Sequence, residues 1–141
     1  MTDMHAPLVL VVDDDQDFLE MTRAVLEKGG YRVACAADPK TALDMMIGEV
    51  PDLVITDLMM QNLGSGFSLS RRIKETPHLQ NVPVIIVTAA ASRLGYDFAP
   101  RNAADLAAMS ADAFIEKPMS PKELLARTDG LVGGGEREKR S

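Results

Sequence analysis

Short apolar runs alternate along most of the chain with longer segments of helical periodicity. The run Leu8–Val12 is apolar at every position, as expected for a parallel strand that is buried on both faces. Other short runs of mainly apolar residues predict four further strands, over Tyr31–Ala36, Asp52–Thr56, Pro83–Thr88 and Ala113–Glu116. Strands that alternate with helices favour an α/β fold, a doubly wound parallel sheet with helices on both faces.

Between the strands, apolar residues recur at the spacing of amphipathic helices. The first predicted helix carries four residues at this spacing and ends at a glycine pair; they are Phe18, Met21, Thr22 and Val25, followed by Gly29-Gly30. Asp38 is expected to cap a second helix that begins at Pro39. The buried face of that helix should hold Ala42, Leu43, Met46 and Ile47.

Three more helices are predicted, around Phe67–Lys74, over the stretch Ala103–Met109, and from Ser120-Pro121 to about Leu131. Basic side chains on the first of these should form a solvated face; they are Arg71, Arg72 and Lys74. The predicted elements fill one domain over residues 7–132, preceded by a short extension at residues 1–6. Residues 133–141 contain glycines and charges without apolar anchors, which predicts a disordered tail.

The amino-acid composition and charge argue against several classes of function. A net charge of −6 argues against direct binding to nucleic acid, because the domain would repel phosphate. The single cysteine, Cys35, cannot form an internal disulfide. The amino-terminal apolar run is short and lacks a preceding basic region, so neither a signal peptide nor membrane insertion is expected. A cytoplasmic location follows as the expectation.

Polar residues are placed at the carboxyl ends of four different predicted strands. Asp13 and Asp14 follow the first strand, Asp57 follows the third, Thr88 ends the fourth and Lys117 follows the fifth. In an open α/β sheet these ends form the crevice where ligands bind. We therefore expect the five side chains to meet there, and we expect Asp15, one position later, to cap the first helix.

Three carboxylates within a few ångströms repel one another by about 4 kcal/mol per adjacent pair at an effective dielectric constant near 20. A cation or a protonation has to relieve such a cluster. Carboxylate and carbonyl oxygens suit Mg²⁺, an ion that often bridges to phosphate. With a lysine and a threonine hydroxyl added, the site can hold a phosphoryl group, and a carboxylate there can act as the nucleophile.

The motifs VLVVDDD, PDLVITDLMM, VPVIIVTAA and FIEKP resemble, in order and spacing, those of response-regulator receiver domains. The resemblance covers about Pro7 to Leu131 and implies the flavodoxin-like strand order 2-1-3-4-5. It implies that Asp57 is the phosphoacceptor and that Asp13, Asp14, Asp57 and the backbone carbonyl of Met59 hold Mg²⁺. It also implies that Lys117 and Thr88 engage the phosphoryl group, and that Thr88 and Phe114 form the switch.

The resemblance implies a single-domain response regulator, phosphorylated by a histidine kinase or histidine phosphotransfer protein and acting on an unidentified downstream protein. It implies no enzyme beyond self-phosphotransfer and autodephosphorylation. The chain departs from the family pattern at two places. Gln61 follows Met60 where the family commonly has proline, which affects the loop beside the acceptor. In addition, 28 residues (89–116) separate Thr88 from Lys117, with the additional material in Ser92–Asn102, which affects the output surface.

Several alternatives remain open. The chain could be a receiver domain from a larger response regulator or hybrid kinase. A phosphohydrolase with an aspartyl-phosphate intermediate would need a second acid two residues after Asp57, where Met59 stands. A flavodoxin-like cofactor binder would need a hydroxyl- and glycine-rich loop after the first strand, where aspartates stand. A degenerate receiver that signals without phosphate is disfavoured because all five site residues are present.

Overall fold

The structure is a computed structural model that describes residues 6–57, 65–89, 112–117 and 120–132, with the backbone alone described for 65–68, 88, 89, 114, 116 and 117. The elements in chain order are β1 (Leu8–Val12), α1 (Gln16–Lys28), β2 (Arg32–Ala36), α2 (Pro39–Gly48), β3 (Leu53–Asp57), α3 (Ser65–Glu75), β4 (Val84–Ala89), β5 (Ala113–Lys117) and α6 (Pro121–Val132). The predicted helix Ala103–Met109 and the predicted tail lie outside the described residues.

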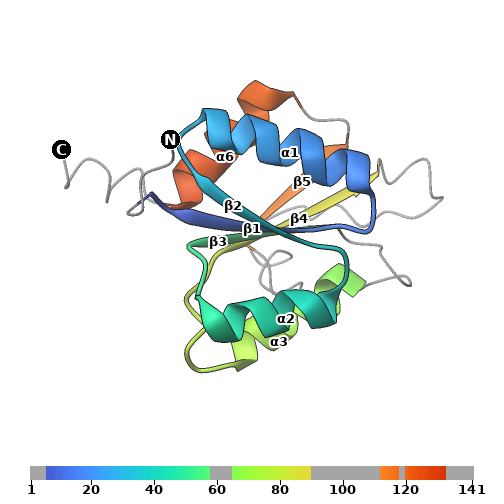
Figure 1. Cartoon of the computed structure of the whole chain (residues 1–141). Coiled ribbons are helices and arrows are strands. Elements are labelled where there is room, and N and C mark those ends of the chain that lie inside the picture. Colours follow the sequence, from blue (N-terminus) through green and yellow to red (C-terminus); the bar gives the residue numbers. More distant parts are fainter. Residues whose placement is uncertain (1–5, 58–64, 90–111, 118–119, 133–141) are drawn as a thin grey trace.

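The five strands form one parallel sheet in the order β2-β1-β3-β4-β5, which confirms the predicted fold. Helices α1 and α6 cover one face of this sheet, and α2 and α3 cover the other (Figure 1). The chain therefore leaves β1 for β2 on one side and returns to β3 on the other. The strand order reverses at β1, and this reversal opens a crevice at the carboxyl ends of β1 and β3.

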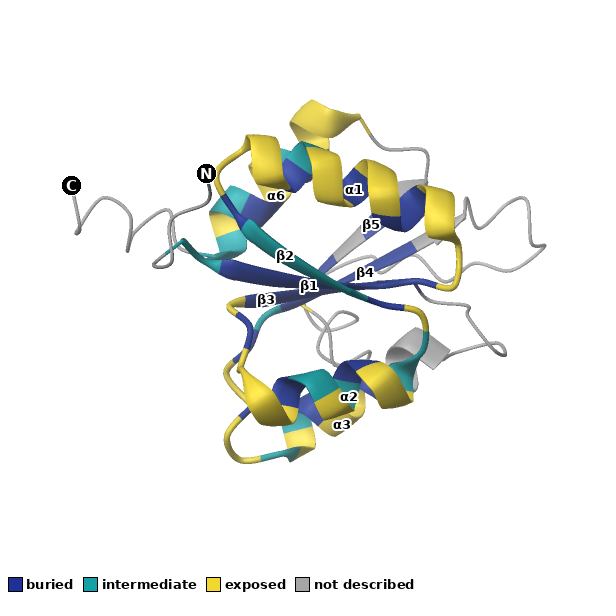
Figure 2. Ribbon diagram, viewed as in Figure 1, coloured by how far each residue is buried: buried dark blue, intermediate teal, exposed yellow. Residues whose placement is uncertain are grey.

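Alternate residues of the central strands feed two separate cores. In β1, Val9 and Val11 pack with residues of α1 and α6, whereas Leu10 and Val12 pack with residues of α2 and α3. Figure 2 shows the consequence: the central strands β1 and β3 are buried between helices whose outer faces are exposed, and the edge strand β2 is mostly half-buried. The continuous apolar run that predicted a strand buried on both faces is explained by these two cores.

The predicted strands are confirmed, with ends that differ by at most one residue. One difference concerns Tyr31, which precedes β2 and is fully buried. Its hydroxyl donates a hydrogen bond to the carboxylate of Asp129 on α6. Asp57 and Lys117 are the last residues of β3 and β5, where we had expected them to follow these strands.

Two predictions about helix faces are wrong. Ile47 is 78% exposed, because it lies about 100° around α2 from the buried Met46 and away from the sheet. Lys74 does not belong to a purely solvated face. Its ammonium group donates hydrogen bonds of 2.8 Å to the Val82 carbonyl and to the Asp112 carboxylate. These bonds connect the end of α3 to the residues that precede β4 and β5.

None of the helices in the described residues is long and apolar enough to cross a membrane. Cys35 lies in β2 and packs against the core beneath α1. Burial raises the pKa of its thiol, and the nearby Arg23 opposes this shift. The thiol therefore stays protonated at neutral pH.

The burial of two threonine hydroxyls leads to a prediction about the free energy of unfolding. The hydroxyls of Thr22 on α1 and Thr128 on α6 are fully buried, and neither has a hydrogen-bond partner in the described part of the chain. An unsatisfied buried hydroxyl destabilises the folded state, so Thr22→Val and Thr128→Val should each raise the free energy of unfolding by about 1 kcal/mol. Urea denaturation measures the change. Thr41→Val is the control, because its hydroxyl bonds to Asp38 at 3.0 Å and its loss should not stabilise. Unchanged or lowered stability in both valine variants would contradict the prediction.

Candidate functional site

Three carboxylates meet at the carboxyl ends of the two central strands. Strands β1 and β3 pair in parallel with Val12 opposite Thr56, so the following residues, Asp13 and Asp57, are neighbours across the strand pair. Asp14 comes next after Asp13. Carboxylate oxygens of the three aspartates lie within 4.8 Å of one another. We call Asp13, Asp14 and Asp57 the acidic cluster.

Burial differs among the members of the acidic cluster. Asp13 is fully buried and Asp57 is 8% exposed, whereas Asp14 is exposed to solvent. The cluster therefore has one open side. A ligand that approaches from solvent would meet Asp14 first and the two buried carboxylates behind it.

Backbone hydrogen bonds hold Asp13 in place. Its N–H donates to the Ala36 carbonyl at the end of β2 at 3.0 Å, and its Oδ1 accepts from the N–H of Asp15 at 2.9 Å. The Asp15 carboxylate in turn accepts from Asp17 N and Phe18 N at 3.0 and 3.3 Å, which caps α1. The prediction that Asp15 caps this helix is confirmed. Sequence reasoning missed its second bond, to Asp13; the position two residues after a strand-end acid is the signal that could have indicated it.

The electrostatics of the acidic cluster favour a cation. Like charges this close repel strongly when two of them are buried. The amino-terminal end of α1 lies beside the cluster and carries a partial positive charge, which offsets part of the repulsion. Three carboxylates are also the oxygen donors that hard divalent ions prefer. The donor set therefore fits such an ion, with the exposed side of Asp14 as its route of entry.

The backbones of two further candidate residues, Thr88 and Lys117, reach the same edge. In the sheet register Asp57 lies opposite Val87, and Ala89 lies opposite Lys117. Thr88 is therefore the residue before the last one of β4, and Lys117 is the last residue of β5, at the edge of the sheet that holds the cluster. Their side chains, and that of Phe114 in β5, are not described. Met59 lies outside the described residues. The roles of these four residues stay predictions.

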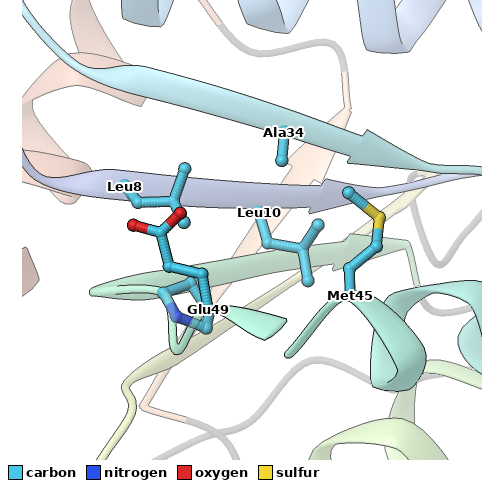
Figure 3. A pocket seen from close by; sticks show the side chains of 6 residues that line it. Leu8, Leu10, Ala34, Met45 and Glu49 are labelled. Atoms are coloured by element: carbon cyan, nitrogen blue, oxygen red, sulfur yellow. The ribbon is translucent and has the colours of Figure 1, made fainter. Parts of the chain in front are cut away.

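A separate small apolar pocket lies at the opposite end of the sheet, between α2 and the strands β1 and β2 (Figure 3). Leu8 and Leu10 line it together with Met45. Leu8 precedes Asp13 by five residues of extended chain, which span about 17 Å. The one acid in its lining, Glu49, is paired with Arg32 at 3.0 Å. With its single carboxylate already paired to an arginine, this pocket does not form a metal site, and it is not part of the acidic site.

The family model of the response regulator receiver domain matches residues 9–129. The chain belongs to this family. It is 36% identical over 124 residues to the response regulator MprA of Mycolicibacterium vanbaalenii, covering 88% of this chain and 49% of that protein. It is 32% identical over 129 residues to the phosphate regulon transcriptional regulatory protein PhoB of Pseudomonas aeruginosa, covering 92% and 53%.

Two solved receiver structures match over nearly their full length. The chemotaxis response regulator CheY4 of Vibrio cholerae superposes with a TM-score of 0.73 at 26% identity, covering 90% of this chain and 98% of that one. The signal receiver domain of a histidine kinase from Syntrophus aciditrophicus gives 0.77 at 29% identity, covering 94% of both chains. By contrast, the receiver spans about half the length of the curated relatives it matches.

Proposed function

We propose that this receiver domain accepts a phosphoryl group on Asp57 from a histidine kinase or a histidine phosphotransfer protein, and that the phosphorylated form binds a downstream protein. The observation that carries the proposal is the acidic cluster, in which the Asp57 carboxylate lies within 4.8 Å of two other carboxylates at the open end of the sheet. Membership of the receiver family supports it, because receiver domains are phosphorylated by histidine kinases.

In this proposal Asp57 is the nucleophile. Its carboxylate oxygen forms a bond to phosphorus while the bond from phosphorus to the donor's imidazole nitrogen breaks, so the phosphoryl group moves between the two proteins. Lys117 and Thr88 would hold phosphoryl oxygens, the lysine as a point charge and the threonine as a hydrogen-bond donor. The near-complete burial of Asp57 restricts the water that could hydrolyse the acyl phosphate.

Asp13, Asp14 and Asp57, with the backbone carbonyl of Met59, would hold Mg²⁺. The bound ion would neutralise the crowded carboxylates and the phosphoryl oxygens. The chain's own contribution is positional: the bonds from Asp15 N and to Ala36 O fix Asp13 before any ion arrives. Preorganisation of this kind reduces the cost of gathering ligands around the ion.

The signal to the downstream protein would follow from the charge that phosphorylation adds. Phosphorylation brings nearly two negative charges beside Lys117 and Thr88. Movement of Thr88 toward them would open space for Phe114 and shift an existing equilibrium at the surface near β4 and β5. The chain would then act as a signalling domain with no turnover of separate substrates. Release of phosphate from phosphomonoesters would favour the phosphohydrolase alternative.

A second candidate function is that this domain performs the same receiver chemistry as one part of a longer regulator. One observation favours it. The chain covers 49% of MprA and 53% of PhoB, and the latter is named a transcriptional regulatory protein. Immunoblotting of the native protein with an antibody against this domain separates the two. A band at the size of the 141-residue chain supports the single-domain regulator, and a band near twice that size supports the longer one.

Cation binding is testable through stability. Because an ion that binds only the folded state stabilises it, MgCl2 at tenfold excess over the dissociation constant should raise the free energy of unfolding by about 1.4 kcal/mol. Denaturation curves with and without MgCl2 measure this. Asp13→Asn should lose the response, and Asp44→Asn, on the exposed side of α2, should keep it. An equal response in both variants would place the ion elsewhere.

Phosphoryl transfer is testable by mass. Incubation with acetyl phosphate and MgCl2 should add one phosphoryl group to the wild-type chain, as measured by intact-protein mass spectrometry. Asp57→Ala and Asp57→Asn should add none, because neither side chain can form an acyl phosphate. Asp44→Asn is again the matched control and should be labelled. A phosphorylated Asp57 variant would refute the assignment of the acceptor.

A further inference from the structure

We propose that Asp15 is a positioning residue for the metal site, orienting Asp13 through the cap of α1. The inference rests on the proposed function, because it assumes that the acidic cluster holds Mg²⁺. It assigns a role to a fourth acid, which is not itself a member of the cluster. The observation behind it is that one residue bonds to a buried cluster acid on one side and to a helix end on the other.

Asp15 makes both sets of hydrogen bonds, one with Asp13 and the other with the first turn of α1. The N–H of Asp15 donates to Asp13 Oδ1 at 2.9 Å, which fixes one oxygen of a fully buried carboxylate. The side chain of Asp15 accepts from Asp17 N at 3.0 Å and Phe18 N at 3.3 Å, and its carbonyl accepts from Leu19 N at 3.1 Å. The first turn of α1 is thereby attached to the residue that orients Asp13.

The backbone conformation links these bonds. Asp15 has φ −92° and ψ 107°, the extended conformation of a capping residue. A residue with no side-chain acceptor would leave the N–H groups of Asp17 and Phe18 without this partner and would hold the start of the helix less firmly. The first turn would then fray, and rotation of residue 15 would turn its N–H away from Asp13. Hydrogen bonds to ligating groups tune metal affinity, and their loss typically weakens binding by roughly 10–100-fold.

The negative charge of Asp15 offers a competing explanation for a loss of Mg²⁺ affinity in its variants. Asp15 is exposed and adds a negative charge close to the cluster, so its removal could weaken cation binding by electrostatics alone. Asparagine and serine keep the capping acceptor and remove the charge, whereas alanine removes both. Positioning therefore predicts that Asp15→Asn and Asp15→Ser resemble the wild-type chain and that Asp15→Ala does not. Electrostatics predicts the same loss in all three variants.

Asp38 provides a matched control for helix capping. It caps α2 through Thr41 N at 2.7 Å, and the pKa of its carboxyl is lowered chiefly by this bond. Its other bonds run to the Thr41 hydroxyl and, through its carbonyl, to Ala42 N, not to the acidic cluster. Asp38→Ala should lower the melting temperature by a few degrees, much as Asp15→Ala does, and leave Mg²⁺ affinity unchanged.

The experiment is a titration of the unphosphorylated chain with MgCl2, followed by two-dimensional amide NMR and accompanied by melting curves. We expect Asp15→Ala to raise the dissociation constant roughly tenfold, the lower end of the range because the N–H itself remains. The amide of residue 15 should also exchange faster with solvent in that variant before any Mg²⁺ is added. Asp15→Asn, Asp15→Ser and Asp38→Ala should stay within twofold of the wild-type affinity.

Three results would overturn the inference while leaving the proposed function intact. These are an unchanged affinity in Asp15→Ala, an equal loss in Asp15→Asn and Asp15→Ser, or an equal loss in Asp38→Ala. Failure of the wild-type chain to bind Mg²⁺ would instead overturn the proposed metal site, and the positioning role with it. The two failures are therefore distinguishable in one titration series.

Discussion

Everything at the candidate site depends on the parallel pairing of β1 with β3. Its register sets Val12 opposite Thr56 and so forces Asp13 and Asp57 together. Repulsion of about 4 kcal/mol per charged pair opposes that arrangement at an effective dielectric constant near 20. The strands prevail because all five side chains of β1 are buried, and each fully buried Val or Leu contributes about 1.5–3 kcal/mol. Hydrophobic burial thus holds charges where they would not otherwise gather.

In this sheet, the residues that stabilise the fold are different from the residues that form the candidate site. Side chains from the two faces of β1 and β3 form two cores, one beneath α1 and α6 and one beneath α2 and α3. The strand ends carry the acids, and α1 begins only three residues after Asp13. A helix start this close supplies N–H groups and a partial positive charge to the cluster. The acids are therefore supported by a helix end as well as by the sheet.

Much of this could be predicted from local patterns. The apolar run Leu8–Val12 and its counterparts predicted the strands, and Asp15 and Asp38 were correctly assigned as caps of the helices that follow them. The meeting of Asp13, Asp14 and Asp57 followed from their places at strand ends. These inferences worked because strand burial and helix capping depend on neighbours within a few positions, which a sequence displays directly.

Within the described residues, sequence alone therefore determined which segments are strands or helices and which acids share an edge, since periodicity and capping are local. The tertiary structure decided which residues face the core and which polar groups pair across the fold. Ile47 fits the helical period yet lies 78% exposed, and Lys74, on an apparently solvated helix face, bonds to Asp112, 38 positions away. Tyr31 likewise bonds to Asp129 across 98 positions. Such contacts depend on how helices pack against the sheet, and no local pattern contains that geometry.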